Sequence, residues 1–280
     1  VICLFIFGYI KLMYPFWNNQ PVYHTYDFMR QFYREPFIIN QYQPGKTKYF
    51  DPVRVKTYNL RETDIGIKKQ VTNSIQCFYL NTDKILHTIH QDDIQAILSG
   101  QSQPSFVSLY CENQYIQEFD ASGSRITKNN LSLGTITSRH LHFWYVNKQK
   151  HKHHFVEMPV YMLDYLCVNR NKEQVNIYRK LLQTHEYSQR SINPSISCSL
   201  IKKEIELFSG IVPFVQYKTY TFKLRNTRVQ TLPKGYFIIE LNKENMDKYV
   251  DFFYNNSDYC SKTELYDVMV FPDVGNITEM

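Results

Sequence analysis

Five histidines gather around one polar segment and are the first candidates for metal chemistry. His140 and His142 alternate along a predicted strand, and the turn that follows carries His151, His153 and His154. Imidazole nitrogens are common zinc ligands, so a zinc site at this place is geometrically conceivable. Lysines lie between these histidines, however, and no cluster of Cys or Glu adjoins them. This pattern favours a solvated basic loop, and we predict no metal site.

The six cysteines offer little for catalysis or for metal binding. They lie far apart, with no C-x-x-C pair, at Cys3, Cys77, Cys111, Cys167, Cys198 and Cys260. Neither a zinc knuckle nor a dense disulfide framework is recognisable, which favours a reducing compartment and predicts a cytoplasmic location. Cys167 has no recognisable His or Asn partner, so we interpret it as a buried strand residue rather than a nucleophile.

The composition excludes several classes of nucleotide-binding protein. The chain has 280 residues, with 23 Tyr, 19 Phe and 9 Gly, and neither a G-x-x-x-x-G-K-[ST] nor a G-x-G-x-x-G loop occurs. With 43% hydrophobic and 21% charged residues, it is typical of a globular protein. The net charge of +6 is spread along the chain. It favours an anionic ligand such as a phosphorylated cofactor, but it predicts no nucleic-acid partner.

The elements that must position any site are clearest in the middle of the chain. Residues 130–146 and 155–168 are rich in β-branched and aromatic side chains around a polar turn, which predicts a long antiparallel hairpin. Residues 169–190 are compatible with a helix. Apolar residues recur at helical spacing over residues 199–208, which predicts a short helix, and residues 211–222 resume a strand pattern.

The remaining segments give weaker patterns. We expect a strand at residues 235–241, a helix at 242–255, and surface loops at 41–48 and 112–130. The apolar run at residues 1–10 is too short to span a bilayer, which needs roughly 20 residues. It is interpreted as a buried strand or helix, with a remnant of an upstream segment or a membrane-related role as the alternatives.

Two long sequence blocks resemble the glycylpeptide N-myristoyltransferases. Residues 14–22 (YPFWNNQPV) are similar to the Y-x-F-W-x-T-Q-P-V string near the start of the family's catalytic region. Residues 133–138 (LGTITS) and, beyond the turn of the hairpin, residues 162–168 (MLDYLCV) form one block that is similar to V-G-F-I-S followed by E-I-N-F-L-C-V. The spacing between these blocks also resembles that of the family.

Two shorter blocks follow in the same order. Residues 200–205 (LIKKEI) are similar to L-I-K-E-I, and residues 209–212 (SGIV) with 220–226 are similar to A-G-V-V followed by Y-W-H-R-S-L-N. The resemblance covers roughly residues 14–226. It implies an acyl-CoA-binding domain at residues 1–226 and, at residues 227–280, the start of a truncated or vestigial second half.

The resemblance implies a fold and an activity. The fold is α+β, of the Gcn5-related N-acetyltransferase type, in which helices flank a twisted mixed sheet and the cofactor thioester lies where two strands splay. The implied activity is transfer of a long-chain acyl group from myristoyl-CoA to the N-terminal glycine of client proteins, by a monomer. The alternative is a catalytically inactive acyl-CoA-binding or protein-interaction module with the same fold. The divergence of the blocks is compatible with a viral member.

The resemblance also implies a set of catalytic residues. An amine that attacks a thioester builds an oxyanion, which donors fixed in advance stabilise. In the family these donors are backbone N–H groups of an F-L pair, which corresponds here to Tyr165 and Leu166. Asp164 stands where the family has Asn and could act as a general base, or it could be a hydrogen-bonded structural residue. The family's Thr at another amine-handling position falls on Phe208.

Further positions are implied for the cofactor. Cys167 and Val168, the next two residues of the strand, would lie along the cofactor, and Pro15, Phe16 and Trp17 would lie against it. The alternative is that Phe16 and Trp17 are plain core residues. The family holds the cofactor's pyrophosphate in a turn at a helix N-terminus. Aligning back from the predicted helix assigns this turn to Arg190, Asn193, Ser195, Ile196 and Ser197.

The last implied site receives the peptide. Asp92 and Asp93 resemble part of the family's acidic E-D-D-D loop, and an exposed loop pair is the alternative interpretation. Tyr220 matches a tyrosine that contacts the peptide in the family.

Overall fold

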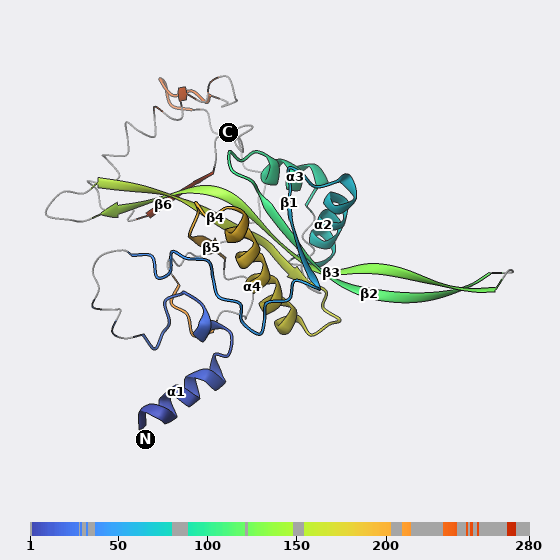
Figure 1. The fold of residues 1–280 in the computed structure, drawn as a ribbon. Coiled ribbons are helices and arrows are strands. Elements are labelled where there is room, and N and C mark those ends of the chain that lie inside the picture. Colours follow the sequence, from blue (N-terminus) through green and yellow to red (C-terminus); the bar gives the residue numbers. More distant parts are fainter. Residues whose placement is uncertain are drawn as a thin grey trace.

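The computed structural model describes residues 2–27, 29, 32, 37–79, 89–120, 123–147, 154–202, 209–213, 232–239, 245, 247–248, 251 and 268–272. Within these residues the protein is built on one twisted mixed sheet with helices on both faces (Figure 1). The expected α+β class, with a mixed sheet flanked by helices, is therefore confirmed.

The sheet has six strands in the order β1-β2-β3-β4-β5, with β6 paired to β3. Their bounds are β1 Val55–Asn59, β2 Phe106–Asp120, β3 Gly123–Asn147, β4 His154–Val168, β5 Ser199–Ile201 and β6 Val268–Pro272. Only the β4–β5 pair is parallel. The β2–β3 pairing ends at Phe106 and Ser138, and β6 takes up the same edge of β3 from Leu141 to Tyr145.

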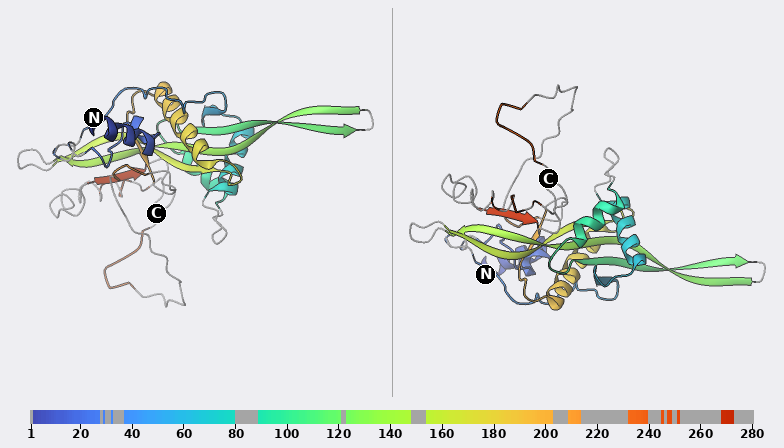
Figure 2. Two further views of the ribbon diagram at one scale, coloured as in Figure 1. Left: turned by 90° about the horizontal axis from the view of Figure 1, so that it is seen from below. Right: turned by 90° about the horizontal axis from the view of Figure 1, so that it is seen from above.

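The predicted central hairpin is confirmed as β3 and β4, but the strands are longer than expected. The surface loop expected at residues 112–130 is wrong, because residues 112–120 belong to β2 and residues 123–130 to β3, with pairing from Glu112 with Leu131 to Asp120 with Gly123. This outer part of the two strands projects from the sheet as a ribbon (Figure 2). Among the described residues no helix lies beside it, so its sequence needs no alternation of apolar and polar residues. The expected loop at residues 41–48 is confirmed.

Helices cover the two faces of the sheet separately (Figure 1). One face carries α2 (Ile65–Phe78) and α3 (Gln91–Ser99), and the other carries α4 (Gln174–Ile192). Asp64 caps α2, because its carboxylate accepts a hydrogen bond of 2.8 Å from the Ile67 N–H. The helix expected at residues 169–190 is confirmed as α4, which starts five residues later than that range.

The two helical layers enclose two apolar clusters. The α4 side holds Phe16, Trp17, Leu133, Ile136, Leu163, Val168 and Leu181 among others. The α2 and α3 side holds Val71, Ile75, Ile94, Leu98, Val107, Leu109 and Cys167 among others. Gly134 of β3 lies where α4 approaches the sheet, since a Cβ there would meet Leu181 Cδ1 at 3.2 Å. A glycine at this position therefore lets α4 pack closely on the sheet.

Three expectations about other segments need correction. The helix expected at residues 199–208 is wrong at its start, where Ser199–Ile201 form strand β5; residues 203–208 lie outside the described part. The strand expected at residues 235–241 is absent from its described part, residues 235–239. The described part of the apolar run, residues 2–10, is helical within α1 (Ile2–Met13), but Phe5, Ile6, Phe7 and Tyr9 are exposed rather than buried.

Candidate functional site

A β-bulge interrupts β4 at the pair implied to carry the oxyanion donors. Two residues of β4, Tyr165 and Leu166, lie opposite the single residue Ile136 of β3. Tyr165 has a φ of 51° and is the only non-glycine residue with a positive φ in the described part of the chain. A bulge of this kind breaks the hydrogen-bond ladder and re-aims the backbone groups of the bulged strand.

The bulge lies where β4 and β5 part. Their parallel pairing covers Tyr161 to Leu163 of β4, opposite Ser199 to Ile201, and stops directly before the bulge. On its other edge β4 stays paired with β3 as far as Val168. The β4–β5 pairing thus ends with β5 itself, one residue before the bulge, and a splay of two strands that holds the thioester stays a prediction.

A second irregularity lies beside the first. The register between β2 and β3 shifts so that Leu133 has no partner residue on β2. Its carbonyl oxygen instead accepts a hydrogen bond of 2.8 Å from the backbone N–H of Asn169, the first residue after β4. This bond fixes the chain as it leaves β4 and turns towards α4.

The side chains of the bulged segment point to both faces of the sheet. The Tyr165 ring packs edge-on against Tyr79 at the end of α2, with ring centroids 5.1 Å apart, while Leu166 packs against the cluster under α4. Cys167 lies in the opposite cluster, where its thiol donates to the Ser74 carbonyl oxygen at 3.6 Å. Burial raises the pKa of Cys167, so its thiol stays protonated. This agrees with its interpretation as a buried strand residue.

Asp164 is tied to the neighbouring strand. Arg139 Nε donates to Asp164 Oδ2 at 2.6 Å, and the Thr137 hydroxyl donates to the Asp164 carbonyl oxygen at 3.1 Å. A carboxylate that already accepts from a guanidinium is a weaker proton acceptor. If Asp164 serves as a base, it has to work beside Arg139.

The aromatic segment lies on the α4 side of the same strand. Phe16 and Trp17 are 2% and 7% exposed, and their rings meet edge-on with centroids 4.8 Å apart. They share one apolar cluster with Leu163 and Val168 of β4. The structure thus brings this segment to the bulged strand and buries its two aromatic rings as core residues. A contact of Pro15, Phe16 or Trp17 with a cofactor stays a prediction.

The turn assigned to the pyrophosphate lies at the wrong end of a helix. Because β5 replaces the expected helix, residues 193–197 follow the C-terminus of α4, whose partial charge is negative and disfavours an anion. Asn193 Nδ2 donates to the Tyr161 hydroxyl at 2.9 Å, and the Ser195 hydroxyl donates to Asn193 Oδ1 at 2.5 Å. Ile196 is 2% exposed, and Ser197 lies between it and β5. The geometry gives these residues structural contacts and does not support a phosphate turn.

Arg190 also has structural partners. Its Nε lies 3.4 Å from Glu186 Oε2, and Nη1 donates to the carbonyl oxygen of Tyr42 at 3.2 Å. Burial raises the pKa of Glu186, against the opposing effect of Arg190. Arg190 therefore ties the end of α4 to the segment around Tyr42.

Another helix start, which the sequence prediction missed, lies next to the bulge. Only residues 169–173 separate β4 from the N-terminus of α4, and this turn carries Arg170 and Lys172. Lys172 Nζ lies 3.3 Å from Glu112 Oε2. The 19 residues of α4 span about 28 Å, so this turn and residues 193–197 lie at opposite ends. In the sequence, the signal for this basic helix start was the presence of Arg170 and Lys172 between a predicted strand and a predicted helix.

The acidic pair belongs to a helix rather than a loop. Asp92 and Asp93 are exposed in the first turn of α3, where negative charge is favourable. Tyr220 lies outside the described residues, as do His151 and His153.

His140 and His142, two of the described histidines, contact each other, and His142 also contacts a glutamate. His142 Nδ1 lies 2.6 Å from Glu157 Oε1, and its ring meets that of His140 at 4.8 Å between centroids. The described part of the chain contains no group of three or more His, Cys, Asp or Glu side chains that could hold a metal ion.

Comparisons with known proteins give a likeness to solved structures alone. No family model matches the sequence, and no curated protein matches it. Three crystal structures of Saccharomyces cerevisiae N-myristoyltransferase with bound myristoyl-CoA, one of them also with inhibitors, are similar at 12% identity, with TM-scores of 0.42, 0.44 and 0.43. The matches cover 67%, 67% and 69% of this chain and 39%, 37% and 40% of those chains. The chain thus spans well under half the length of the structures that it resembles.

Proposed function

We propose that this chain is an N-myristoyltransferase-like protein that transfers a long-chain acyl group from acyl-CoA to the N-terminal glycine of client proteins. The observation that carries the proposal is the bulge at Tyr165 and Leu166, at the point where β4 leaves β5. The resemblance of the four sequence blocks to the family implies that the oxyanion donors are the backbone N–H groups of the same two residues, which supports the proposal. Backbone N–H groups that are fixed before the reaction stabilise the charge that develops on the thioester oxygen.

Myristoyl-CoA would lie along the bulged strand. We propose that its thioester faces the backbone of Tyr165 and Leu166, with Cys167 and Val168 continuing the strand and residues 15–17 closing the α4 side. Its anionic pyrophosphate would then meet the N-terminus of α4, beside Arg170 and Lys172. A helix N-terminus offers backbone N–H donors and a partial positive charge to such a group.

The peptide amine has to lose a proton before or during attack. Asp164 is the carboxylate next to the bulge, and we propose that it accepts this proton while Arg139 holds its other side in place. Asp92, Asp93 and Tyr220 are proposed to receive the peptide, on the strength of the sequence blocks alone.

Acyl transfer can be measured directly. The purified protein is incubated with myristoyl-CoA and a glycine-initiated peptide, and the acyl-peptide is detected by mass spectrometry. Leu166→Pro removes one proposed N–H donor and should slow transfer on the order of 10²-fold or more, whereas Leu166→Ala and Tyr165→Phe keep the backbone and should change it little. Calorimetric binding of myristoyl-CoA shows that each variant still folds. Absence of transfer at high protein concentration would refute the catalytic proposal, and equal rates for Leu166→Pro and Leu166→Ala would refute the role of the backbone donor.

The second candidate is an acyl-CoA-binding or protein-interaction module without catalysis. The bond between Asp164 and Arg139 favours it, because it engages the carboxylate nearest the bulge. Heat of binding with myristoyl-CoA, without any acyl-peptide, would support this candidate. No heat of binding would exclude both candidates as acyl-CoA binders.

The organisation of the chain is proposed on the same grounds. Residues 1–226 would form the acyl-CoA-binding domain, and residues 227–280 would begin a second half. Strand β6 comes from that second segment and joins the sheet of the first through β3. We expect a cytoplasmic monomer that binds no nucleic acid and holds no metal.

A further inference from the structure

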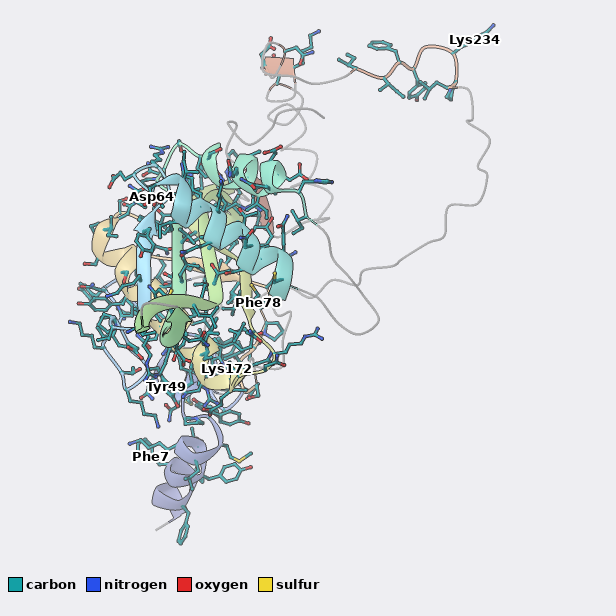
Figure 3. The ribbon with its side chains drawn as sticks, turned by 90° about the vertical axis from the view of Figure 1, so that its right-hand side faces the viewer. Phe7, Tyr49, Asp64, Phe78, Lys172 and Lys234 are labelled. Carbon is teal, nitrogen blue, oxygen red and sulfur yellow. The ribbon has the colours of Figure 1, made fainter. Side chains whose placement is uncertain are left out.

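Helix α1 stands away from the body of the protein (Figures 1 and 3). Six of its large apolar side chains are exposed. The exposed fractions are 74% for Phe5, 54% for Ile6, 57% for Phe7, 61% for Tyr9, 82% for Leu12 and 53% for Met13. Exposed apolar surface of this size marks an interaction site.

The exposed side chains surround the helix instead of forming one stripe. Successive residues of an α-helix point about 100° apart, so Phe5, Ile6 and Phe7 face three different directions. A partner protein with a single groove would cover one of these directions and leave the others in water. A helix that is apolar on all sides requires a medium that encloses it.

The position of Lys11 sets how deeply α1 can enter a bilayer. Half of the hydrocarbon core of a bilayer is about 15 Å thick. Lys11 is the only charged residue of the helix and lies about 14 Å along the axis from Ile2. If the first turn enters the apolar region, Lys11 reaches the depth of the lipid phosphates. No described helix is both long and apolar enough to cross a membrane.

Two exposed lysines, Lys46 and Lys48, lie in the segment that packs near the base of α1. Tyr49 lies at the same end of the molecule as Phe7 (Figure 3), and its ring packs on Phe16, with centroids 5.3 Å apart, just beyond the end of α1. The exposed Lys48 lies over the Tyr49 ring at 5.2 Å, and Lys46 is exposed two residues earlier. Cations beside an inserted helix are attracted to anionic phospholipids.

The base of α1 is attached to the body by aromatic packing. Tyr14 follows the helix directly, and its ring lies 5.7 Å from that of Tyr26. The same ring fills the space above Gly210, whose φ is 80°. Insertion of α1 would therefore hold the whole protein at the membrane.

We propose that α1 inserts into one leaflet of an anionic phospholipid membrane, with Lys11, Lys46 and Lys48 at the level of the headgroups. This membrane surface is independent of the proposed acyl transfer, since it uses none of the residues around the bulge.

Flotation with vesicles tests the proposal. The purified protein is centrifuged through a density gradient with vesicles of phosphatidylcholine containing about 30% phosphatidylserine. We expect the unmodified protein to float and Phe5→Ser/Phe7→Ser to lose about tenfold or more of its vesicle-bound fraction. Tyr236→Ser/Phe237→Ser is the matched control, because it removes two aromatic side chains that are 72% and 75% exposed elsewhere. It should float as the unmodified protein does.

Several results would overturn the proposal. The first is that the unmodified protein does not float with the vesicles. The second is that both double variants lose the same share of their vesicle-bound fraction. The third is that the protein forms a dimer that depends on Phe5 and Phe7 and binds no vesicles. Circular dichroism confirms that the variants fold, and acyl transfer to a soluble peptide should be unchanged by Phe5→Ser/Phe7→Ser.

Discussion

The left-handed backbone at Tyr165 gives a sharp test of the bulge. An L residue in this region crowds its Cβ against the backbone at a cost of about 1–2 kcal/mol, which glycine escapes. Tyr165→Ala and Tyr165→Gly both remove the contact with Tyr79 and differ only in that Cβ. Glycine loses about 0.4–1 kcal/mol of this advantage through the greater entropy of the unfolded chain. The Gly variant should therefore be more stable than the Ala variant by about 0.5–1 kcal/mol.

A regular position on the same strand supplies the control. Met162 pairs with Arg139 in the ordinary ladder of β4, so Met162→Gly should be less stable than Met162→Ala by about 0.5–1 kcal/mol. The free energy of unfolding of the four variants is measured by urea denaturation with tryptophan fluorescence. The sign of the Gly–Ala difference should reverse between the two positions. If alanine is the more stable residue at both, the bulge at Tyr165 does not have this conformation, and the oxyanion role loses its support.

Three further predictions concern the interior and the site. Burial lowers the pKa of His185 to about 3, below its ordinary value of 6.5, so the unfolded chain binds the extra proton between these values. The free energy of unfolding should therefore fall as the pH drops from 6.5 towards 3, by up to about 1.4 kcal/mol per pH unit. Urea midpoints measured over this pH range should fall less steeply for His185→Gln than for the unmodified protein. Gly134→Ala should lower the free energy of unfolding by about 1–3 kcal/mol, because its Cβ would meet the Cys167 carbonyl oxygen at 2.9 Å; an unchanged thermal midpoint would contradict this packing. Asp164→Asn should leave calorimetric binding of myristoyl-CoA intact and lower the rate of acyl transfer about 10²-fold. An unchanged rate of transfer would show that Asp164 is a structural partner of Arg139 and not the base.

The sequence predicts best the elements that pack on both sides. The hairpin of β3 and β4 is rich in β-branched and aromatic residues because its central part is enclosed between α4 and the α2–α3 layer. The ribbon formed by the outer parts of β2 and β3 was missed for the opposite reason. It lies beyond the helices, so no helix imposes an apolar face on its sequence.

Other failures come from patterns that fit more than one structure. The apolar residues Leu200 and Ile201 fit a helix face, but they form part of the short strand β5, whose pairing with β4 depends on tertiary contact. That single error led the alignment to place the expected phosphate turn at residues 193–197, which follow α4 instead of preceding a helix. Residues 2–10 of α1 contain no charged residue and therefore show no apolar period, so the sequence could not distinguish a buried helix from an exposed one.

The irregular features of the sheet lie close together, beside the turn from β4 into α4. Their position helps to choose between the two candidate functions. The bulge at Tyr165 and Leu166, the unpaired register of Leu133 and the close packing at Gly134 all lie beside the turn into α4. A protein kept only to bind acyl-CoA needs the turn and the apolar cluster, but it gains nothing from a tyrosine in left-handed conformation. Backbone strain of this kind persists where the surrounding structure enforces it, and it gathers at active sites. The bulge therefore favours the acyltransferase over the inert module, and the rate of Leu166→Pro is the measurement that decides between them.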